Sequence, residues 1–316
     1  MQLVRGIHNI ELKTQFSRQG CVLTIGNFDG VHLGHGRVIN ALVAKAKARG
    51  VPSAVMVFEP QPQELFSPNT APARLTRLRD KYVLLKRLGV DYLICVNFNR
   101  KFSNLSATEF VEHLLVNKLN IKHLIIGDDF HFGKNRKGDF SMLLAAGKRF
   151  NFTVSDTASF KLENCRISST EIRKALVEGN LADAEKMLGR PYAIIGRVFH
   201  GDKRGRELGF PTANILLKRR VSPVSGVYVV KVHTQYGAFD GVANIGQRPT
   251  ILGVRQQLEV HIFDFEQIIY GQIIEVELLY KLREEIRFAS LTELTAQIAI
   301  DCNNARKVIS DINLKN

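Results

Sequence analysis

The sequence predicts an α/β domain followed by a mainly β domain. In the first half, short apolar runs rich in β-branched residues alternate with helix-like segments, which is typical of a parallel sheet covered on both faces. In the second half, strands joined by tight turns follow one another and favour an antiparallel sheet. A length of 316 residues suits two domains, each large enough to bury its own core.

The first half contains four strand candidates, at residues 21–26, 53–58, 91–96 and 122–127. Between the first two, residues 38–49 are rich in Ala and Lys and stop at Gly50, as a helix with a C-terminal glycine does. Ligands bind at the carboxyl ends of parallel strands, so the turns after these strands are candidate sites.

Capping-box spacing marks further helix starts. Ser106 is followed by Glu109, and Ser168 by Glu171, so that each pair can satisfy free backbone N–H groups of a first turn. The helix at Ser168 should end near Gly179, and a short helix should follow over residues 180–188.

Beyond residue 189 the pattern predicts a small antiparallel β-barrel with a terminal helix. Strands are expected at 227–233, 238–245, 258–265 and 272–282. The last helix should start at Ser290, with Glu293 completing a capping box, and run toward Ile312. The expected domains are therefore residues 1–186 and 187–316.

The composition is that of a cytoplasmic protein. No apolar run approaches the roughly 18 residues of a membrane helix, and the N-terminus lacks the pattern of a signal peptide. The cysteines lie far apart without a Cys-x-x-Cys pair, which argues against a zinc site and a disulfide framework and favours buried or free thiols. They are Cys21, Cys95, Cys165 and Cys302.

A net charge of +14 calls for anionic partners. Residues 196–220 contain seven Lys and Arg but only two acidic residues. Nucleic-acid surfaces usually add stacking aromatics, which are not in register with these charges, so nucleotide phosphates are the better partner. We expect no nucleic-acid or membrane partner and a monomer or transient homo-oligomer. An RNA-binding barrel, with steep loss of affinity in salt, is the alternative from another class.

Residues 201–214 form the most informative segment. Three glycines four residues apart let a backbone pass close to a ligand, and three basic residues among them supply charge for phosphate. The glycines are Gly201, Gly205 and Gly209, and the basic residues are Lys203, Arg204 and Arg206. Thr212 and Asn214 follow, a hydroxyl and a carboxamide of the kind that Mg²⁺ accepts beside phosphate oxygens. The segment predicts kinase chemistry without the Walker A or His-Arg-Asp motifs.

The turn after the first expected strand is a candidate anion site. It reads Gly-Asn-Phe-Asp-Gly-Val-His-Leu-Gly-His over residues 26–35 and leads into a helix, whose free N–H groups and dipole favour an anion. The pattern from His32 to His35 resembles that of nucleotidyltransferases that attack the α-phosphate of ATP. A metal site is an alternative, although the pair lacks a third ligand at plausible spacing. Another alternative is that both histidines are purely structural, with their hydrogen bonds satisfied inside the protein.

A second segment supports the nucleotidyltransferase interpretation. Residues 167–173 resemble the Ile-Ser-Ser-Thr-x-Ile-Arg segment that closes over ATP in the same enzymes, although alone they would be an ordinary helix cap. Adenylyl transfer to a phosphate asks little of acid–base groups, because the attacking phosphate is already ionised. Catalysis then depends on positioning and on positive charge, which His32 and His35 can supply.

Taken in order, the motifs resemble the bacterial bifunctional riboflavin kinase/FAD synthetase family. Beside those above, the match includes Gly-Asp-Asp-Phe-His-Phe-Gly at 127–133, Gly-Val-Ala-Asn-Ile-Gly at 241–246 and Leu-Glu-Val-His-Ile-Phe-Asp-Phe at 258–265. The resemblance implies an N-terminal Rossmann-like FMN adenylyltransferase domain and a C-terminal riboflavin kinase domain. It also implies ATP and Mg²⁺ for both, riboflavin and FMN as substrates, and FMN and FAD as products.

The resemblance also implies roles for single residues. In the first domain His32 and His35 would be catalytic and handle ATP phosphates, and Asp129 and Phe130 would bind the flavin; His131 stands where the family more often has arginine. The other ATP- and phosphate-binding residues would be Gly26, Asn27, Phe28, Asp29, Gly34, Arg166, Ser169, Thr170 and Arg173, with Gly201, Lys203, Gly205, Arg206 and Gly209 in the second domain.

In the kinase domain Thr212 and Asn214 would hold Mg²⁺, and Glu259 would be the general base. A base is needed because the 5′-hydroxyl of riboflavin must lose a proton as it attacks the γ-phosphate. Strand alternation separates Glu259 from Leu258 and Val260 and lets it point toward a ligand. A single-function adenylyltransferase with a regulatory barrel is the nearest alternative, and it leaves Glu259 without a role.

Overall fold

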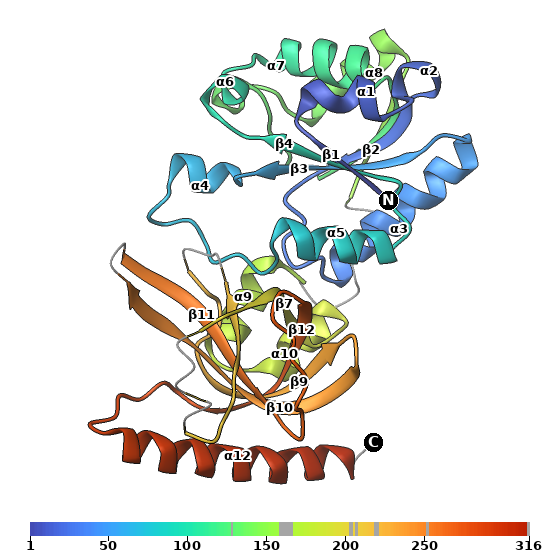
Figure 1. Cartoon of the computed structure of the whole chain (residues 1–316). Coiled ribbons are helices and arrows are strands. Elements are labelled where there is room, and N and C mark those ends of the chain that lie inside the picture. The colour runs from blue at the N-terminus through green and yellow to red at the C-terminus, as the bar shows by residue number, and fades with distance from the viewer. Residues whose placement is uncertain are drawn as a thin grey trace. The chain divides into compact units, whose positions relative to one another are not determined.

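The computed structural model describes residues 1–127, 129–157, 167–201, 205, 208–217, 221–250 and 253–314, without the side chains of 247–250 and 253–255. Packing divides the chain into two units (Figure 1). The first unit comprises residues 1–72 and 76–167, and the second comprises residues 73–75 and 168–316. An α/β unit precedes a mainly β unit, which confirms the predicted fold class.

The first unit is built on a six-stranded sheet in which every pair of neighbouring strands is parallel. In spatial order its strands are β1 (Gln2–Arg5), β4 (Tyr92–Asn97), β3 (Ser53–Glu59), β2 (Cys21–Ile25), β5 (Ile121–Ile126) and β6 (Thr153–Asp156). The four expected strands are confirmed to within one residue at each end. The two edge strands were not expected, because each has only four residues and carries partly exposed positions that blur the apolar signal.

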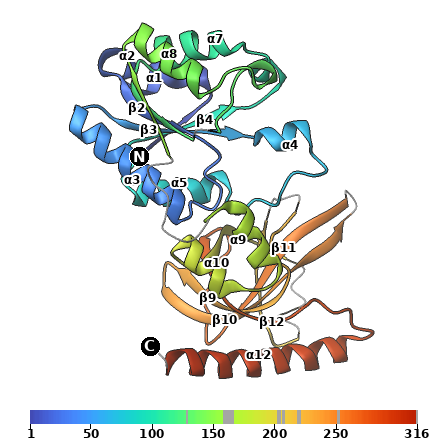
Figure 2. The same ribbon diagram turned by 180° about the vertical axis from the view of Figure 1, so that it is seen from behind.

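Helices cover both faces of this sheet (Figures 1 and 2). One face packs against α3 (Leu33–Arg49) and α5 (Leu78–Arg87). The other packs against α1 (Ile10–Lys13), α2 (Phe16–Gln19), α7 (Ala107–Glu109), the π-helical segment η2 (Phe110–Lys118) and α8 (Phe140–Phe150). Short helical segments η1 (Ile7–Asn9), α4 (Pro62–Phe66), α6 (Arg100–Ser103) and η3 (Lys134–Arg136) lie in the connections.

The strand order locates a ligand crevice in this unit. The chain passes from β2 to β3 on one side of β2, and later returns to β5 on its other side. The connections thus diverge between β2 and β5, and open parallel sheets bind ligands at such a point, beyond the carboxyl ends of the strands. Both flanking turns, after β2 and after β5, carry motifs singled out in the sequence.

The second unit contains a closed six-stranded barrel whose paired strands are all antiparallel. Around the barrel its strands are β10 (Gly237–Thr250), β11 (Gly253–Ile262), β8 (Ala213–Leu216), β7 (Tyr192–Phe199), β12 (Ile273–Arg283) and β9 (Gly226–Thr234). The four expected strands are present, although β10 extends five residues beyond its expected end, and β11 starts five residues before its expected start and ends three residues early; β7 and β8 were not expected. β8 has only four residues and follows a glycine-rich segment, so its sequence pattern is too short to stand out.

Helices α9 (Ser169–Val177) and α10 (Leu181–Leu188) pack with the barrel interior in one apolar core. Residues 73–75 join this core, because Leu75 is fully buried in it and its carbonyl accepts a hydrogen bond from the Tyr192 hydroxyl at 3.1 Å. The contacts therefore group these two helices with the barrel, although the expected division at residue 186 assigns them to the first domain. The expected domain boundary between residues 186 and 187 stays a prediction.

The terminal helix α12 (Leu291–Asn313) covers an outer face of the barrel. Cys302 and Ala305 pack there on Val227, Val229 and Val242. The Ser290 hydroxyl accepts a hydrogen bond from the Glu293 N–H at 3.2 Å, which confirms the expected start of the helix. In the part of the chain that the structure describes, no helix is long and apolar enough to span a membrane.

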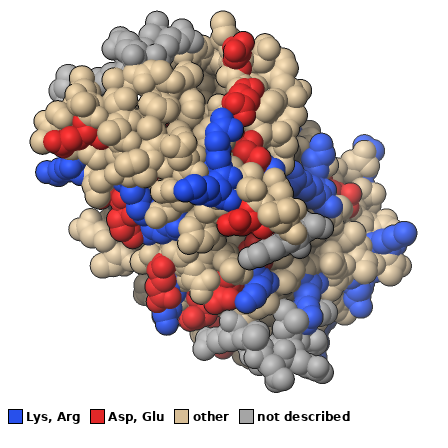
Figure 3. Space-filling view, turned by 90° about the horizontal axis from the view of Figure 1, so that it is seen from below, with Lys and Arg blue, Asp and Glu red and all other residues tan. Residues whose placement is uncertain are grey.

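The three described cysteines, Cys21, Cys95 and Cys302, are buried free thiols, and Cys165 lies outside the described residues. Most of the seven Lys and Arg between residues 196 and 220 also lie outside the described residues. On the face shown in Figure 3, Lys and Arg side chains are interspersed with Asp and Glu.

Candidate active sites

The turn after β2, residues 26–35, brings His32 and His35 together, and we call it the histidine turn. His32 is the N-cap of α3, and its Nδ1 accepts a hydrogen bond from the His35 backbone N–H at 3.2 Å. The helix therefore begins at Leu33, five residues before the expected start. The two imidazoles stack with centroids 3.6 Å apart. A Cβ at Gly34 would lie 3.2 Å from the His32 ring, so the glycine between the histidines leaves room for this ring.

His35 is held neutral in this turn. Burial lowers its pKa well below the ordinary histidine value, and the charges of His32 and Lys81 lower it further. Its Nδ1 is buried, and none of the described residues makes a hydrogen bond to it. The sequence-based expectation was a positive charge at this position. In the free protein His35 instead offers a neutral imidazole, which can donate or accept a hydrogen bond but carries no charge.

The backbone of the turn is strained and firmly anchored. Phe28 and Val31 have φ of 45° and 41°, in the left-handed region that side chains rarely adopt. Asp29 is buried, and its Oδ1 accepts hydrogen bonds from the Thr76 N–H at 2.9 Å and the Thr76 hydroxyl at 3.0 Å. The same hydroxyl accepts the Gly30 N–H at 2.9 Å. Asp29 therefore shapes the turn, whereas Asn27 is exposed.

The turn after β5 places Asp129 and Phe130 at the neighbouring strand end. Asp129 is exposed, and its Oδ1 would lie 2.5 Å from a Cβ at Gly127, so the side chain folds over this glycine. The carbonyl of Asp129 lies 2.8 Å from Nδ1 of His131. Phe130 stacks on Phe132 with centroids 5.8 Å apart. Because β2 and β5 are adjacent, this turn and the histidine turn lie at the same edge of the sheet.

Phenylalanines gather beyond the carboxyl ends of β3, β4 and β5. Neighbouring rings in this aromatic cluster have centroids between 5.1 and 6.4 Å apart. Its members are Phe58, Phe66, Phe98, Phe102, Phe110, Phe130 and Phe132. Phe66 is 52% exposed, so the cluster has aromatic surface that a ligand can reach. Of these residues, only Phe130 and Phe132 were singled out in the sequence. The cluster could have been predicted from the phenylalanines that lie within or just after three successive strands, β3, β4 and β5.

The segment expected to close over ATP belongs to the second unit. Ser169 and Thr170 lie in the first turn of α9, and Ser168 caps it by accepting the Glu171 N–H at 3.2 Å. The Arg173 side chain donates a hydrogen bond from Nε to the Ala73 carbonyl at 2.6 Å. Arg166 lies outside the described residues. A role for these residues at an ATP site stays a prediction.

In the barrel, three polar side chains stand side by side across neighbouring strands. Glu259 on β11 is directly opposite Asn214 on β8 and Asn244 on β10. Leu258 and Val260, next to Glu259 in sequence, are buried in the barrel core, so Glu259 is on the opposite face, as the alternation predicts. We call Asn214, Glu259 and Asn244 the polar row. Asn244 lies in a motif that the sequence comparison used without giving this residue a role.

Gln257 connects two members of the polar row. Its Nε2 donates hydrogen bonds to Asn214 Oδ1 at 2.6 Å and to Glu259 Oε1 at 3.2 Å. These two bonds hold the Asn214 and Glu259 side chains together on the outer face of the barrel. Gln257 was not expected, because the residues that it joins come together only through the pairing of β8 with β11.

Glycine backbone packs over the expected metal ligands. A Cβ at Gly201 would lie 2.6 Å from Asn214 Nδ2, and one at Gly205 would lie 3.3 Å from Thr212 Oγ1. Gly209 has φ of 82°, which only glycine adopts easily. The hydroxyl of Thr212 and the carboxamide of Asn214 are hard oxygen donors, so the residues present fit Mg²⁺. Lys203 and Arg206 lie outside the described residues.

A cavity of about 210 Å³ adjoins the polar row. One part of its wall is polar and includes Thr212, Asn244 and Glu259. Another part is apolar and is formed by Phe288 and the first turns of α12, with Leu291, Leu294 and Ile298. A neighbouring hollow of about 450 Å³ shares Asn244, Glu259 and Glu285 with it. A ligand with an apolar ring and a hydroxylated chain would match such a divided wall.

Comparison with known proteins agrees with this division into two sites. Residues 14–171 match the family model described as FAD synthetase, and residues 188–309 match the one described as riboflavin kinase. The chain is 53% identical over 308 residues to the bifunctional riboflavin kinase/FMN adenylyltransferase of Escherichia coli K12, covering 97% of both chains. It is 54% identical over 307 residues to the enzyme of the same name from Haemophilus influenzae, covering 97% of this chain and 98% of that one.

A solved structure covers both units as well. The crystal structure titled a macrolide-efflux protein from Streptococcus pneumoniae matches with a TM-score of 0.75 and 32% identity, over 95% of this chain and 97% of the other. The two family models and the nearly full-length curated relatives together settle the classification. This chain belongs to the bifunctional riboflavin kinase/FMN adenylyltransferase family.

Proposed function

We propose that this chain makes FAD from riboflavin in two ATP-dependent steps. The barrel unit transfers the γ-phosphoryl group of ATP to the 5′-hydroxyl of riboflavin, which gives FMN and ADP. The parallel-sheet unit transfers the adenylyl group of a second ATP to the FMN phosphate, which gives FAD and pyrophosphate. The observation that carries the proposal is the match of two family models, one to each half of the chain, each over a candidate site.

For the kinase step, Glu259 is the general base. It lines the cavity and stands in the polar row beside Asn214, where it can accept the proton of the substrate hydroxyl. Thr212 and Asn214 would hold Mg²⁺, which would neutralise charge on the transferring phosphoryl group. The apolar wall formed by Phe288, Leu291 and Leu294 suits the isoalloxazine ring. Mg²⁺ and a cytoplasmic location belong to the proposal.

For the adenylyl step, the histidine turn binds the phosphates. The FMN phosphate is ionised near neutral pH and attacks without a base, so the site needs hydrogen-bond donors aimed at the α-phosphate. The N-terminus of α3 supplies backbone N–H groups, and His32 and His35 supply imidazole N–H groups. An anion beside His35 would favour its charged form and raise its pKa, which restores the expected cation when ATP is present.

The aromatic cluster is the candidate flavin site of the same unit. It lies at the carboxyl edge of the sheet, where the turns after β2 and β5 also lie, and the exposed ring of Phe66 offers a stacking surface. Phe98 lies against Phe66 and completes this surface. Phe130 belongs to this cluster and Asp129 precedes it in the turn after β5, and the resemblance implies that both bind the flavin.

A time course tests both activities together. Purified protein is incubated with riboflavin, ATP and Mg²⁺, and the flavins are separated by chromatography. FMN should appear first and FAD later. FAD from added FMN, without any FMN from riboflavin, would instead support a single-function adenylyltransferase with a regulatory barrel. FMN without FAD would contradict the role given to the histidine turn.

A further inference from the structure

Beyond these assignments, we propose that Glu285 is a specificity residue of the kinase site that accepts hydrogen bonds from the ribityl hydroxyls of riboflavin. The inference rests on the proposed location of the kinase site at Glu259. It names a second carboxylate in the same cavity and separates recognition of the substrate's chain from recognition of its ring.

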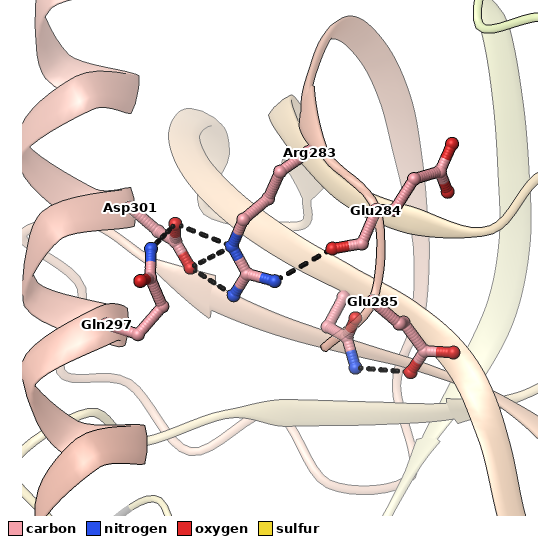
Figure 4. A network of polar contacts seen from close by, with 6 residues as sticks. Arg283, Glu284, Glu285, Gln297 and Asp301 are labelled. Atoms are coloured by element: carbon pink, nitrogen blue, oxygen red, sulfur yellow. Dashed lines mark hydrogen bonds and ion pairs between the residues drawn. The ribbon is translucent and has the colours of Figure 1, made fainter. Parts of the chain in front are cut away.

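The backbone just before Glu285 is anchored by Arg283 (Figure 4). Arg283, the last residue of β12, donates from Nε at 2.9 Å and Nη2 at 2.6 Å to the carboxylate of Asp301 on α12. Gln297 donates a further bond to the same carboxylate at 2.9 Å. Nη1 of Arg283 donates to the Glu284 carbonyl at 2.9 Å, so the peptide just before Glu285 is held.

The carboxylate of Glu285 is directed toward the polar row. Its Oε1 accepts a hydrogen bond from Asn244 Nδ2 at 3.4 Å. A Cβ at Gly246 would overlap this carboxylate, so only glycine leaves room for it there. Glu284, its neighbour, instead pairs with Lys281 and points elsewhere (Figure 4). The two adjacent glutamates therefore have different surroundings, and only Glu285 lines the cavity beside Glu259.

Charge decides which ligand group Glu285 can meet. A second carboxylate would repel the triphosphate, whose oxygens belong at the Thr212 and Asn214 end of the row. It would attract hydroxyl groups, which donate charge-assisted hydrogen bonds to a carboxylate. Asn244 stands between Glu259 and Glu285 and offers both a donor and an acceptor. A polyol chain with its reacting end at Glu259 would thus extend past Asn244 to Glu285.

The test compares riboflavin with lumiflavin, which has the same ring and no ribityl chain. Lumiflavin cannot be phosphorylated, so its inhibition constant against riboflavin kinase reports binding of the ring in this site alone. Glu285→Gln keeps one acceptor oxygen but loses the negative charge, and it should raise KM for riboflavin about 5- to 10-fold, because hydrogen bonds to a charged acceptor are about twice as strong as neutral ones. The inhibition constant of lumiflavin should stay within about twofold, because the ring contacts are untouched.

Two further variants serve as control and confirmation. Glu284→Gln, the matched control, should change neither constant. Gly246→Ala should displace the Glu285 carboxylate and also raise KM for riboflavin, while the inhibition constant of lumiflavin stays within about twofold. FAD formation from FMN, which the other unit performs, should be unchanged in all three, which confines any change to the barrel unit.

The inference would be overturned if KM for riboflavin were unchanged in Glu285→Gln, or if both constants rose together. Loss of the kinase activity in Glu259→Gln establishes the site separately. If Glu259→Gln left FMN formation intact, the proposed site itself would be wrong. If only Glu285→Gln failed, the site would stand and the role of Glu285 would fall.

Discussion

In the proposed mechanism, the histidine turn and the polar row use opposite chemical groups for their reactions with ATP. The turn is a strained backbone loop at a helix N-terminus, and its functional side chains are two stacked imidazoles, one of which is desolvated and neutral. The polar row is a set of carboxylate and amide groups on three strands, beside an accessible cavity. One unit offers donors to a phosphate, and the other offers acceptors to a hydroxyl.

The difference follows from the two nucleophiles. The phosphate of FMN arrives ionised, so its site needs only position and donors for the charge that grows on the α-phosphate. The 5′-hydroxyl of riboflavin arrives protonated and requires a base, which a carboxylate such as Glu259 provides. In the proposed mechanism ATP therefore reacts at one site without a general base and at the other with one, because the two attacking groups differ in protonation state.

The strongest test of this contrast removes the base. Glu259→Gln keeps the size of the side chain and should lower kcat of riboflavin kinase by about 10²- to 10⁴-fold, the usual contribution of a general base. Adenylylation of added FMN should be unchanged. Glu277→Gln is the control, because Glu277 is a strand glutamate of the same barrel that pairs with His233 at 3.2 Å. Equal loss of both activities would refute separate sites.

The converse test removes a donor from the histidine turn. His35→Ala should lower kcat for FAD formation by about 10²- to 10³-fold, as expected for loss of one preorganised group at a developing charge. FMN should then accumulate from riboflavin, because the kinase step is unaffected. His113→Ala, an exposed histidine of η2, serves as the control. A parallel fall in FMN formation would contradict the division of labour.

The two sites also differ in how far the sequence predicts them. The histidine turn is contiguous, so its pattern was visible in residues 26–35, and buried apolar runs located β2 to β5. Glu259 was found through the family resemblance, and strand alternation placed it on the face opposite the barrel core. Asn244, Gln257 and Glu285 were missed, because they join Glu259 only when β8, β10, β11 and the end of β12 meet in the barrel. The aromatic cluster likewise forms from three separate strand ends.

Breaking the anchor under the kinase cavity should cost stability in the second unit. Asp301 is 5% exposed, and Asp301→Ala leaves Arg283 without its partner, a change that typically costs about 3 kcal/mol or more. Urea denaturation should show the loss in the transition of this unit. The pair Arg283→Met with Asp301→Leu should regain most of the stability, because two apolar groups leave no charge unpaired. A double variant as unstable as Asp301→Ala would contradict this account.

The smallest expected effect concerns a second neutral histidine in the first unit. Burial, with the charges of Arg49 and Lys45, lowers the pKa of His123 to about 4 from 6.5, and its ring nitrogens contact Thr153 and Ser155. The unfolded chain therefore binds a proton first, so the free energy of unfolding should fall as the pH drops from 6.5 toward about 4. His123→Gln, which cannot titrate, should flatten this dependence in urea titrations at about pH 7, 5.5 and 4.5. If the free energy of unfolding depended on pH in the same way in both proteins, His123 would not be the group that titrates.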